Sequence, residues 1–98
     1  MRPYDIVLKR GAIEDLDRLR TYDATQVADA MEKHLTYEPT KESRSRIKRL
    51  RGISHPDYRL RVADYRVFYS VREQERRADV LWIMHKDETR AYYEELER

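Results

Sequence analysis

Residues 58–71 constrain the fold most, because apolar and charged side chains alternate there over two short runs. The first run is Tyr58–Val62 (YRLRV) and the second is Tyr65–Val71 (YRVFYSV), and only Ala63 and Asp64 separate them. Alternation with a period of two is typical of a strand that has one buried face. The pattern therefore predicts two adjacent strands joined by a tight connection.

Cations and tyrosines share the surface of these predicted strands. Arg59 and Arg61 lie two residues apart, so both point the same way from a strand. Arg66, His85 and Lys86 add further positive or protonatable groups. Such a surface suits a phosphate diester, with tyrosines available to stack on a base.

The N-terminal half predicts one strand followed by two helices. Tyr4–Leu8 (YDIVL) is a short β-rich run, and Gly11 ends it. Apolar residues then recur at helical spacing in two stretches, which predicts two helices. Acids lie in the first turns of the first helix, and Asp23 is expected to be the N-cap of the second. The first stretch contains Ile13, Leu16 and Leu19 with the acids Glu14, Asp15 and Asp17, and the second contains Val27, Met31 and Leu35. The two helices are expected to form an αα-hairpin that Pro39 ends.

The C-terminal half predicts the rest of the sheet and a last helix. Asp79–Met84 (DVLWIM) is the most apolar run and is expected to be the central strand. Asp87 is expected to cap a helix over Glu88–Glu97, which carries Tyr92 and Tyr93. The order β-α-α-β-β-β-α predicts an α+β fold, with the N-terminal helical hairpin packed on a mostly antiparallel four-stranded sheet. Residues 1–98 are expected to form a single domain.

Charge is distributed unevenly along the chain. Lys41–Arg72 contains ten Lys/Arg and three Asp/Glu, a net charge of +7, whereas the whole chain carries only +2. A basic middle flanked by acidic helices indicates a polyanion site on one side of the molecule. Solvated loops that happen to be rich in arginine are the alternative explanation.

Several kinds of site lack their residues in this sequence. Cysteine is absent, which excludes disulfides and thiolate chemistry. Three scattered histidines without clustered carboxylates predict neither a metal site nor a cofactor. No apolar run approaches the roughly 18–20 residues of a membrane span, and no signal-peptide segment begins the sequence, so a cytoplasmic location is expected.

Three segments together resemble the RelE/ParE superfamily of toxins from type II toxin–antitoxin systems. They are KRLRG at 48–52, YRLRVADYRVFYSV at 58–71, and a strand ending in IMHK before a tyrosine-bearing helix. The Asp-Tyr-Arg of residues 64–66, followed by alternating apolar residues, is the most characteristic. The resemblance implies a RelE-like fold. In the RelE-like branch it implies a ribosome-dependent endoribonuclease that cuts mRNA in the A site of the 30S subunit.

RelE-type members carry basic residues on the sheet and a tyrosine on the last helix. The resemblance assigns this catalytic set to Arg59, Arg61, Arg66, Lys86 and Tyr92, with three Lys/Arg exchanges relative to RelE. His85 is a further catalytic candidate, because other members use histidine for proton transfer. The remaining basic residues of the first segment, Lys48, Arg49 and Arg51, are expected to bind the RNA backbone.

These residue types suit metal-free RNA cleavage by attack of the 2′-OH on the adjacent phosphate. Arg61 and Arg66 would stabilise the charge of the phosphorane. Tyr92 would orient or deprotonate the 2′-OH, in a field of cations expected to lower its pKa, or would stack on a base. His85 or Lys86 would deliver the proton to the 5′-oxygen, leaving a 2′,3′-cyclic phosphate.

Other functions and roles stay open at the level of sequence. A ParE-like inhibitor of DNA gyrase shares the fold and the Asp-Tyr-Arg motif but needs no tyrosine–cation set. A catalytically degenerate member would only bind RNA or an antitoxin. Arg66 would then serve as a structural partner of Asp64 or Asp79, and one of Tyr92 and Tyr93 is expected to pack in the core. The resemblance implies as partners a cognate antitoxin, in a toxin–antitoxin hetero-oligomer, and the ribosome with its mRNA.

Overall fold

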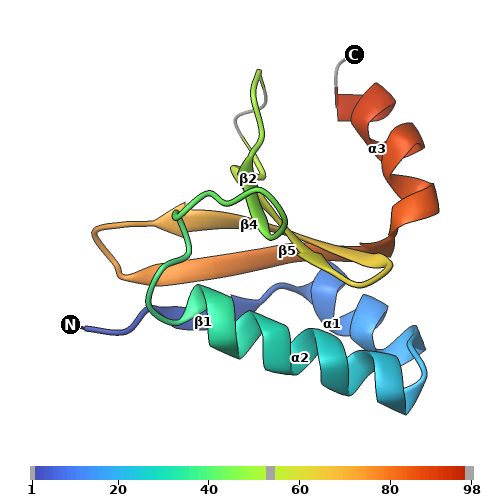
Figure 1. Cartoon of the computed structure of the whole chain (residues 1–98), viewed down its shortest axis with the longest axis horizontal. Coiled ribbons are helices and arrows are strands. Elements are labelled where there is room, and N and C mark those ends of the chain that lie inside the picture. The colour runs from blue at the N-terminus through green and yellow to red at the C-terminus, as the bar shows by residue number, and fades with distance from the viewer. Residues whose placement is uncertain (1, 53–54, 97–98) are drawn as a thin grey trace.

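A five-stranded sheet with helices on both faces forms the molecule (Figure 1). The computed structural model describes residues 2–52 and 55–96. The strands are β1 Asp5–Leu8, β2 Ile47–Arg49, β3 Tyr58–Val62, β4 Tyr65–Arg72 and β5 Arg77–His85. The helices are α1 Arg10–Arg18, α2 Thr21–Leu35 and α3 Thr89–Leu96, with the 3₁₀ turn η1 Lys86–Glu88 directly before α3. No described helix is long and apolar enough to cross a membrane.

The predicted α+β architecture is confirmed, but the strand count of four is wrong. The sheet order is β1-β5-β4-β3-β2, with β1 parallel to β5 and every other pair antiparallel. The additional strand, β2, is a short edge strand that pairs Ile47 with Leu60. Only Ile47 of its three residues is buried, so β2 has no apolar run from which a strand is predicted.

The Asp79–Met84 segment lies in the interior of the sheet, as predicted, next to β4, the middle strand of the five. That segment lies within β5, which has β1 on one side and β4 on the other. β5 is apolar because helices cover both of its faces: α1 and α2 lie on one side of the sheet, and α3 stands over the other side at one end (Figure 1).

Three predicted helix boundaries are corrected. Gly11 lies inside α1, which begins at Arg10, so the first turn contains no acid. α2 begins at Thr21, and Asp23 accepts a hydrogen bond from the Tyr65 hydroxyl at 3.2 Å instead of capping the helix. His85, rather than Asp87, is the N-cap of η1. The predicted end of the last helix at Glu97 lies outside the described residues.

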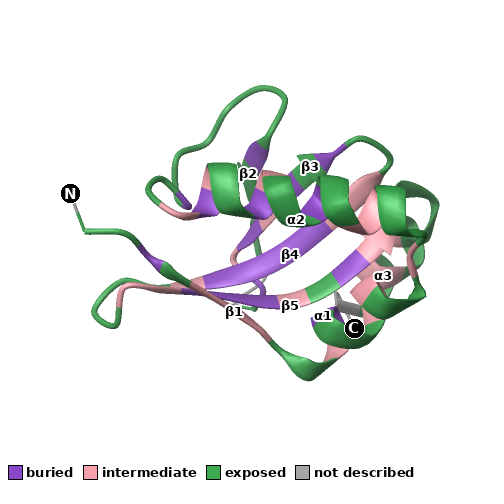
Figure 2. Ribbon diagram, turned by 90° about the horizontal axis from the view of Figure 1, so that it is seen from below, coloured by how far each residue is buried: buried purple, intermediate pink, exposed green. Residues whose placement is uncertain are grey.

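The core lies between α2 and the sheet, as the apolar stripe of α2 predicts (Figure 2). Val27, Met31 and Leu35 recur every four residues, and all three are buried. They pack with the inward-facing residues of β3 and β4, among which the Tyr58 and Tyr69 rings stack at 5.6 Å. Removing one such aliphatic side chain typically costs about 2–5 kcal/mol. The core therefore fixes which face of β3 and β4 is left for function.

Beyond the end of β1, the exposed edge of β5 makes its contacts with α1. The parallel pairing stops at Leu8 and Val80. Beyond this pair, the carboxylate of Asp15 accepts a hydrogen bond from the Ile83 N–H at 2.9 Å. A side chain of α1 thereby supplies the hydrogen-bond partner for a backbone N–H group at the strand edge that β1 leaves unpaired.

Candidate nucleic-acid site

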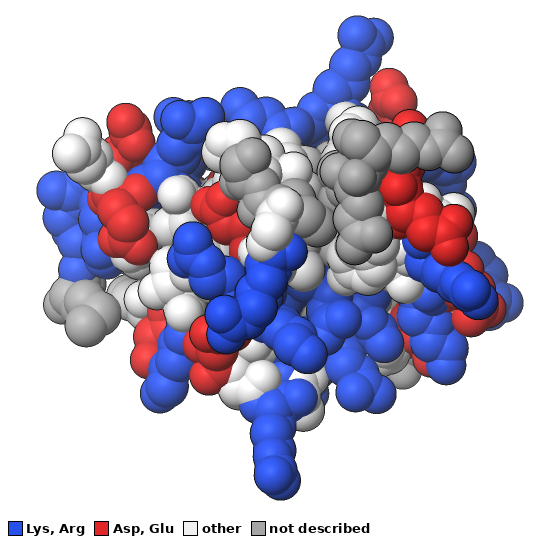
Figure 3. Space-filling view, turned by 90° about the horizontal axis from the view of Figure 1, so that it is seen from above, with Lys and Arg blue, Asp and Glu red and all other residues white. Residues whose placement is uncertain are grey.

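Strand pleating places the arginines of the β3–β4 hairpin on the sheet face opposite α1 and α2, here called the open face. Leu60 and Val67 are fully buried against the helical hairpin, so the residues next to them in sequence point the other way. Arg61 pairs directly with Arg66, and Arg59 pairs with Phe68. Figure 3 looks onto this side of the molecule, where Lys and Arg side chains gather near the middle.

Arg66 is held in place without a carboxylate partner. Its guanidinium donates to the carbonyls of Ala63 and Tyr65, both at 2.9 Å. Among the described residues it forms no ion pair. Partial burial, and then the cations of Arg59 and Arg61, lower the pKa of the Arg66 guanidinium from its ordinary value. Arginine stays protonated nonetheless, so the three like charges repel one another until an anion binds.

The structural alternative for Arg66, an ion pair with Asp79, is not formed. Asp79 is buried at the other end of the sheet, where Arg77 binds it through two hydrogen bonds of 2.7 and 3.2 Å. Arg72 and Lys9 lie 3.7 and 4.0 Å from the same carboxylate. The charge of Asp79 is therefore satisfied without Arg66.

Arg59 contributes a buried donor without a partner. Its Nε is shielded from solvent and makes no hydrogen bond with any described residue. Leaving such a donor unpaired costs about 1–3 kcal/mol. An anion bound between the arginines would satisfy it.

Lys86 reaches the site from the end of β5 but is partly neutralised. Its Nζ lies 3.5 Å from Asp64 Oδ1, and its backbone N–H donates to the Asp64 carbonyl at 2.7 Å. Both side chains are at least half exposed, so this ion pair is weak and opens at little cost.

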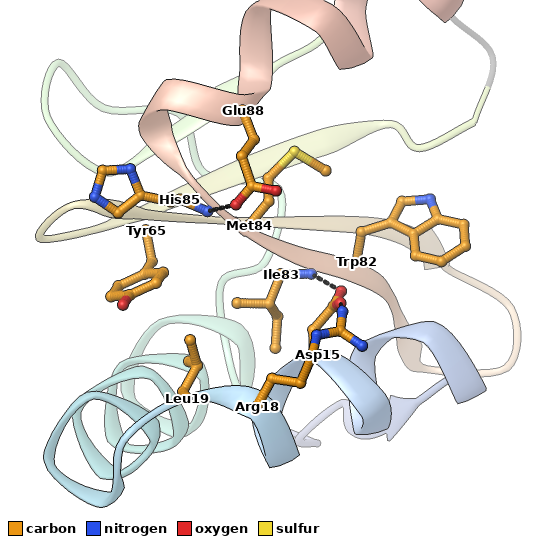
Figure 4. A pocket seen from close by; sticks show the side chains of 9 residues that line it. All are labelled: Asp15, Arg18, Leu19, Tyr65, Trp82, Ile83, Met84, His85 and Glu88. Carbon is orange, nitrogen blue, oxygen red and sulfur yellow. Dashed lines mark hydrogen bonds and ion pairs between the residues drawn. The ribbon is translucent and has the colours of Figure 1, made fainter.

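The structure separates His85 from the arginines. His85 lies two residues from the buried Ile83, so strand alternation directs it to the helical side of the sheet. Its ring meets Tyr65 edge-on at 5.6 Å, and its Nδ1 accepts a hydrogen bond from the Asp87 N–H at 3.1 Å. Figure 4 shows His85 with Tyr65 in a pocket between β5 and α1.

The two tyrosines of α3 lie over Phe68, at ring-centre distances of 4.9 Å for Tyr92 and 5.8 Å for Tyr93. Tyr93 lies near Arg66, where it counteracts part of the lowering of the Arg66 pKa by burial and by the two other arginines. Tyr92 instead lines an apolar pocket with Trp82. α3 thus places one tyrosine on the arginine side of the open face and the other on the tryptophan side.

The expectation that cations lower the pKa of Tyr92 is wrong. Burial first, and then the neighbouring Tyr93, raise the pKa of Tyr92 to about 12, while the Trp82 side chain acts in the opposite direction. The pKa is raised because the Tyr92 ring packs on Phe68 and Trp82 and does not lie near the guanidinium groups. Tyr92 is consequently a poor base near neutral pH.

The three basic residues predicted to bind the RNA backbone are in different surroundings. Lys48 is exposed and pairs with Arg59 across β2 and β3, so it extends the open face. Arg49 points to the other side, where its guanidinium donates to the Tyr58 hydroxyl at 3.2 Å. Arg51 is exposed in the turn after β2. Only Lys48 continues the row of cations.

The open face thus offers several guanidinium groups, the ammonium groups of Lys48 and Lys86, and a tyrosine hydroxyl. Within the described ranges, no three His, Cys, Asp or Glu side chains are close enough together to hold a metal ion. This donor set suits a phosphate diester, since guanidinium groups match pairs of phosphate oxygens.

A family model described as "ParE toxin of type II toxin-antitoxin system, parDE" matches residues 6–90. The chain belongs to the ParE toxin family. It is thus a toxin of a type II toxin–antitoxin system. No curated protein sequence matches the toxin at a significant level.

Solved RelE structures share the fold of the toxin. The RelBE2 toxin–antitoxin complex of Mycobacterium tuberculosis gives a TM-score of 0.75 at 24% identity, covering 87% of this chain and 93% of that chain. The archaeal RelE–RelB complex of Pyrococcus horikoshii OT3 gives 0.68 at 25%, covering 84% and 93%. The isolated Escherichia coli RelE toxin gives 0.72 at 20%, covering 97% of each chain. The toxin therefore has a RelE-like fold.

Sequence reasoning missed two residues that shape the site of the toxin. Tyr93 was predicted only as one of two helical tyrosines, because the amino-acid sequence does not determine how a short last helix is oriented on the sheet. Phe68 was predicted only as a strand residue. Because it pairs with Arg59, it faces the open side of the sheet, where both tyrosine rings pack on it. The alternation of β4 offered a signal, since Phe68 lies two residues from Arg66.

Proposed function

We propose that this toxin is an endoribonuclease that cleaves mRNA on the ribosome without a metal ion, as RelE-type members of the superfamily do. The convergence of Arg59, Arg61 and Arg66 on one open sheet face is the observation that carries the proposal. These charges repel one another in the free protein, and a phosphate diester would relieve that repulsion.

Cleavage would begin when the 2′-OH gives its proton to solvent water and its oxygen attacks the adjacent phosphorus, and it would end with departure of the 5′-oxygen, which takes up a proton. The products are a 2′,3′-cyclic phosphate and a 5′-hydroxyl, and no water is consumed. Arg61 and Arg66 would bind the non-bridging oxygens, whose charge grows in the transition state. Lys86 would deliver the proton to the 5′-oxygen after it separates from Asp64.

We assign the helical hydroxyl that orients the 2′-OH to Tyr93 rather than to Tyr92. The proximity of Tyr93 to Arg66 supports this choice, because the 2′-OH lies next to the phosphate that the arginines would bind. Tyr92 would position α3 by packing on Phe68. His85 receives less support as a proton donor, because its ring packs on Tyr65 at the helical side of the sheet.

Inhibition of DNA gyrase is the second candidate function. The description of the matching family as ParE toxins favours it, because ParE-type members act on gyrase. Such a toxin would use the fold as a binding module and would need no convergent arginines. Supercoiling by purified gyrase in the presence of the toxin separates this function from RNA cleavage.

We further propose that a cognate antitoxin binds the toxin and covers the open face. The similar M. tuberculosis and P. horikoshii structures are toxin–antitoxin complexes. The net charge of +7 over Lys41–Arg72 favours an acidic partner there. The ribosome and its mRNA would be the targets, which places the action in the cytoplasm.

Primer extension on mRNA from cells that express the toxin tests the proposed function. Discrete stops inside translated codons, absent with Arg61→Gln, are the expected result. Intact messages combined with accumulation of relaxed DNA would favour the gyrase candidate instead.

A further inference from the structure

A second basic surface lies next to the open face, in a groove between α2 and the β2–β3 edge of the sheet. One cavity of about 550 Å³ and a neighbouring one of about 390 Å³ form this groove. Both cavities are lined by Lys33 and His34 of α2 and by Ser45 and Arg46, which precede β2. Arg61 lines the larger cavity as well, so the groove adjoins the arginines of the open face.

Three of the cations that line this groove are not neutralised by any carboxylate of the described residues. Lys33, Arg46 and Arg61 form no ion pair with any carboxylate in the described part of the chain. The groove contains two acids: Asp29 in the larger cavity, and Glu38 in the smaller one, which is paired with Lys41 at 3.3 Å. An excess of positive charge along a concave surface indicates a polyanion ligand.

Two further observations show that these cations are held close together. Burial, followed by the charges of Arg46 and Lys33, lowers the pKa of His34. The guanidinium of Arg46 donates to the Arg61 carbonyl at 3.3 Å, and the Arg61 N–H donates to the Arg46 carbonyl at 2.9 Å. Arg46 is thereby fixed to β3 before any ligand binds, which reduces the entropy lost on binding.

We propose that this groove binds the phosphate backbone of RNA and extends the binding track of the open face past Arg61. The choice of RNA rests on the proposed function, whereas the groove itself is defined by its own cations. Several cations spread along an open groove suit a run of phosphates. Because phosphate contacts carry no sequence information, binding in the groove is expected to be independent of sequence.

Salt-dependent binding of labelled RNA tests the groove. The long probe is a 2′-O-methyl RNA of about 12 nucleotides, because stacked nucleotides rise about 3.4 Å each and the longest dimension of the molecule is 36 Å. The short probe has about 4 nucleotides and fills only the open face. Neither probe has a free 2′-OH, so binding is measured without cleavage.

The variants are Lys33→Gln, Arg46→Gln and the double substitution. Arg10→Gln is the charge-matched control for the single variants, because Arg10 is exposed on α1 away from the groove and its substitution also removes one positive charge. Each phosphate contact to a single strand contributes about 0.7 to the slope of log affinity against log salt. The double variant should therefore lose about 1.4 from this slope with the long probe. Between 0.05 and 0.2 M salt, the wild type and Arg10→Gln should lose about sevenfold more affinity than the double variant.

Three results would overturn the groove proposal. The first is an unchanged slope in the double variant, and the second is an equal loss with the short probe, which would place the effect on the open face. The third is unchanged RNA binding together with weakened antitoxin binding, which would make the groove a protein-binding surface. Failure of the proposed function would appear separately, as absence of cleavage by a toxin whose groove variants still change the salt slope.

Discussion

Arg61 and Arg66 oppose each other directly across the β3–β4 hairpin, although both carry a positive charge and neither forms an ion pair with a described carboxylate. Like charges in opposed strand positions destabilise a sheet. Asp64 is near, but its carboxylate pairs with Lys86. This repulsion supports the proposal that the hairpin binds an anionic ligand.

Arg61→Gln should strongly impair cleavage while the fold is preserved. Relief of the repulsion should leave the free energy of unfolding unchanged or raise it by about 0.2–1 kcal/mol. Loss of one phosphate clamp should slow cleavage on programmed ribosomes by about 10²–10³. Denaturant unfolding and single-turnover cleavage measure the two effects, with Arg10→Gln as the charge-matched control. A folded variant with full activity contradicts the proposed role.

Tyr93→Phe should slow single-turnover cleavage more than Tyr92→Phe. Both variants keep a ring that packs on Phe68, so only a hydroxyl is removed. The order is the reverse of the one predicted from the family resemblance, which assigned the catalytic tyrosine to Tyr92. A larger loss in Tyr92→Phe would restore that assignment.

Gly11→Ala should destabilise the toxin. A Cβ at Gly11 would overlap with Cζ3 of Trp82 and would lie 3.0 Å from the Leu81 carbonyl oxygen, so the α1–β5 contact has no room for it. Overpacking of this kind typically costs about 1–3 kcal/mol. Thermal unfolding of Gly11→Ala, Trp82→Ala and the double variant should show that removing the indole recovers part of the loss. Strictly additive effects would mean that the ring and the glycine do not conflict.

Asp79→Asn should destabilise the fold in a pH-dependent way. The hydrogen bonds from Arg77 come first among the causes that lower the pKa of the Asp79 carboxyl. A lowered folded-state pKa stabilises the protein above the unfolded value of about 3.9, and this contribution is lost as the pH falls through the folded value. The wild type should be more stable by about 1–3 kcal/mol at pH 7.

The stability difference between wild type and Asp79→Asn should shrink below about pH 4. Urea unfolding at pH 7, 4 and 3 measures it. Arg72→Gln is a suitable comparison, because it removes a partner at 3.7 Å and leaves the two hydrogen bonds from Arg77 in place. A difference that stays constant over this pH range would show that the ion pair is not its origin.

The strongest periodic patterns of the sequence predicted the fold correctly. The spacing of Val27, Met31 and Leu35 predicted the buried stripe of α2, and the alternation around Ala63 and Asp64 predicted the β3–β4 pair. β2 escaped prediction because an edge strand of three residues with one buried side chain leaves almost no pattern.

The positions of candidate site residues on strands could be predicted, because strand alternation decides which face a side chain points to. The positions of those on α3 could not, because they depend on how the helix packs. Arg59 and Arg61 share a face because they lie two residues apart. The same rule puts His85 on the side of Ile83, away from the arginines. Tyr92 and Tyr93 are adjacent on a helix, so their roles depend on how α3 docks over Phe68, which no local pattern encodes.

Cleavage of mRNA programmed in the ribosomal A site, with ribose or 2′-deoxyribose at the scissile nucleotide, tests the central claim most directly. The account predicts that wild-type toxin cuts the all-ribose message to a 2′,3′-cyclic phosphate and a 5′-hydroxyl, and that it leaves the 2′-deoxy message intact. Cutting of the 2′-deoxy message, or no cutting of either message by a toxin that inhibits gyrase, would contradict it.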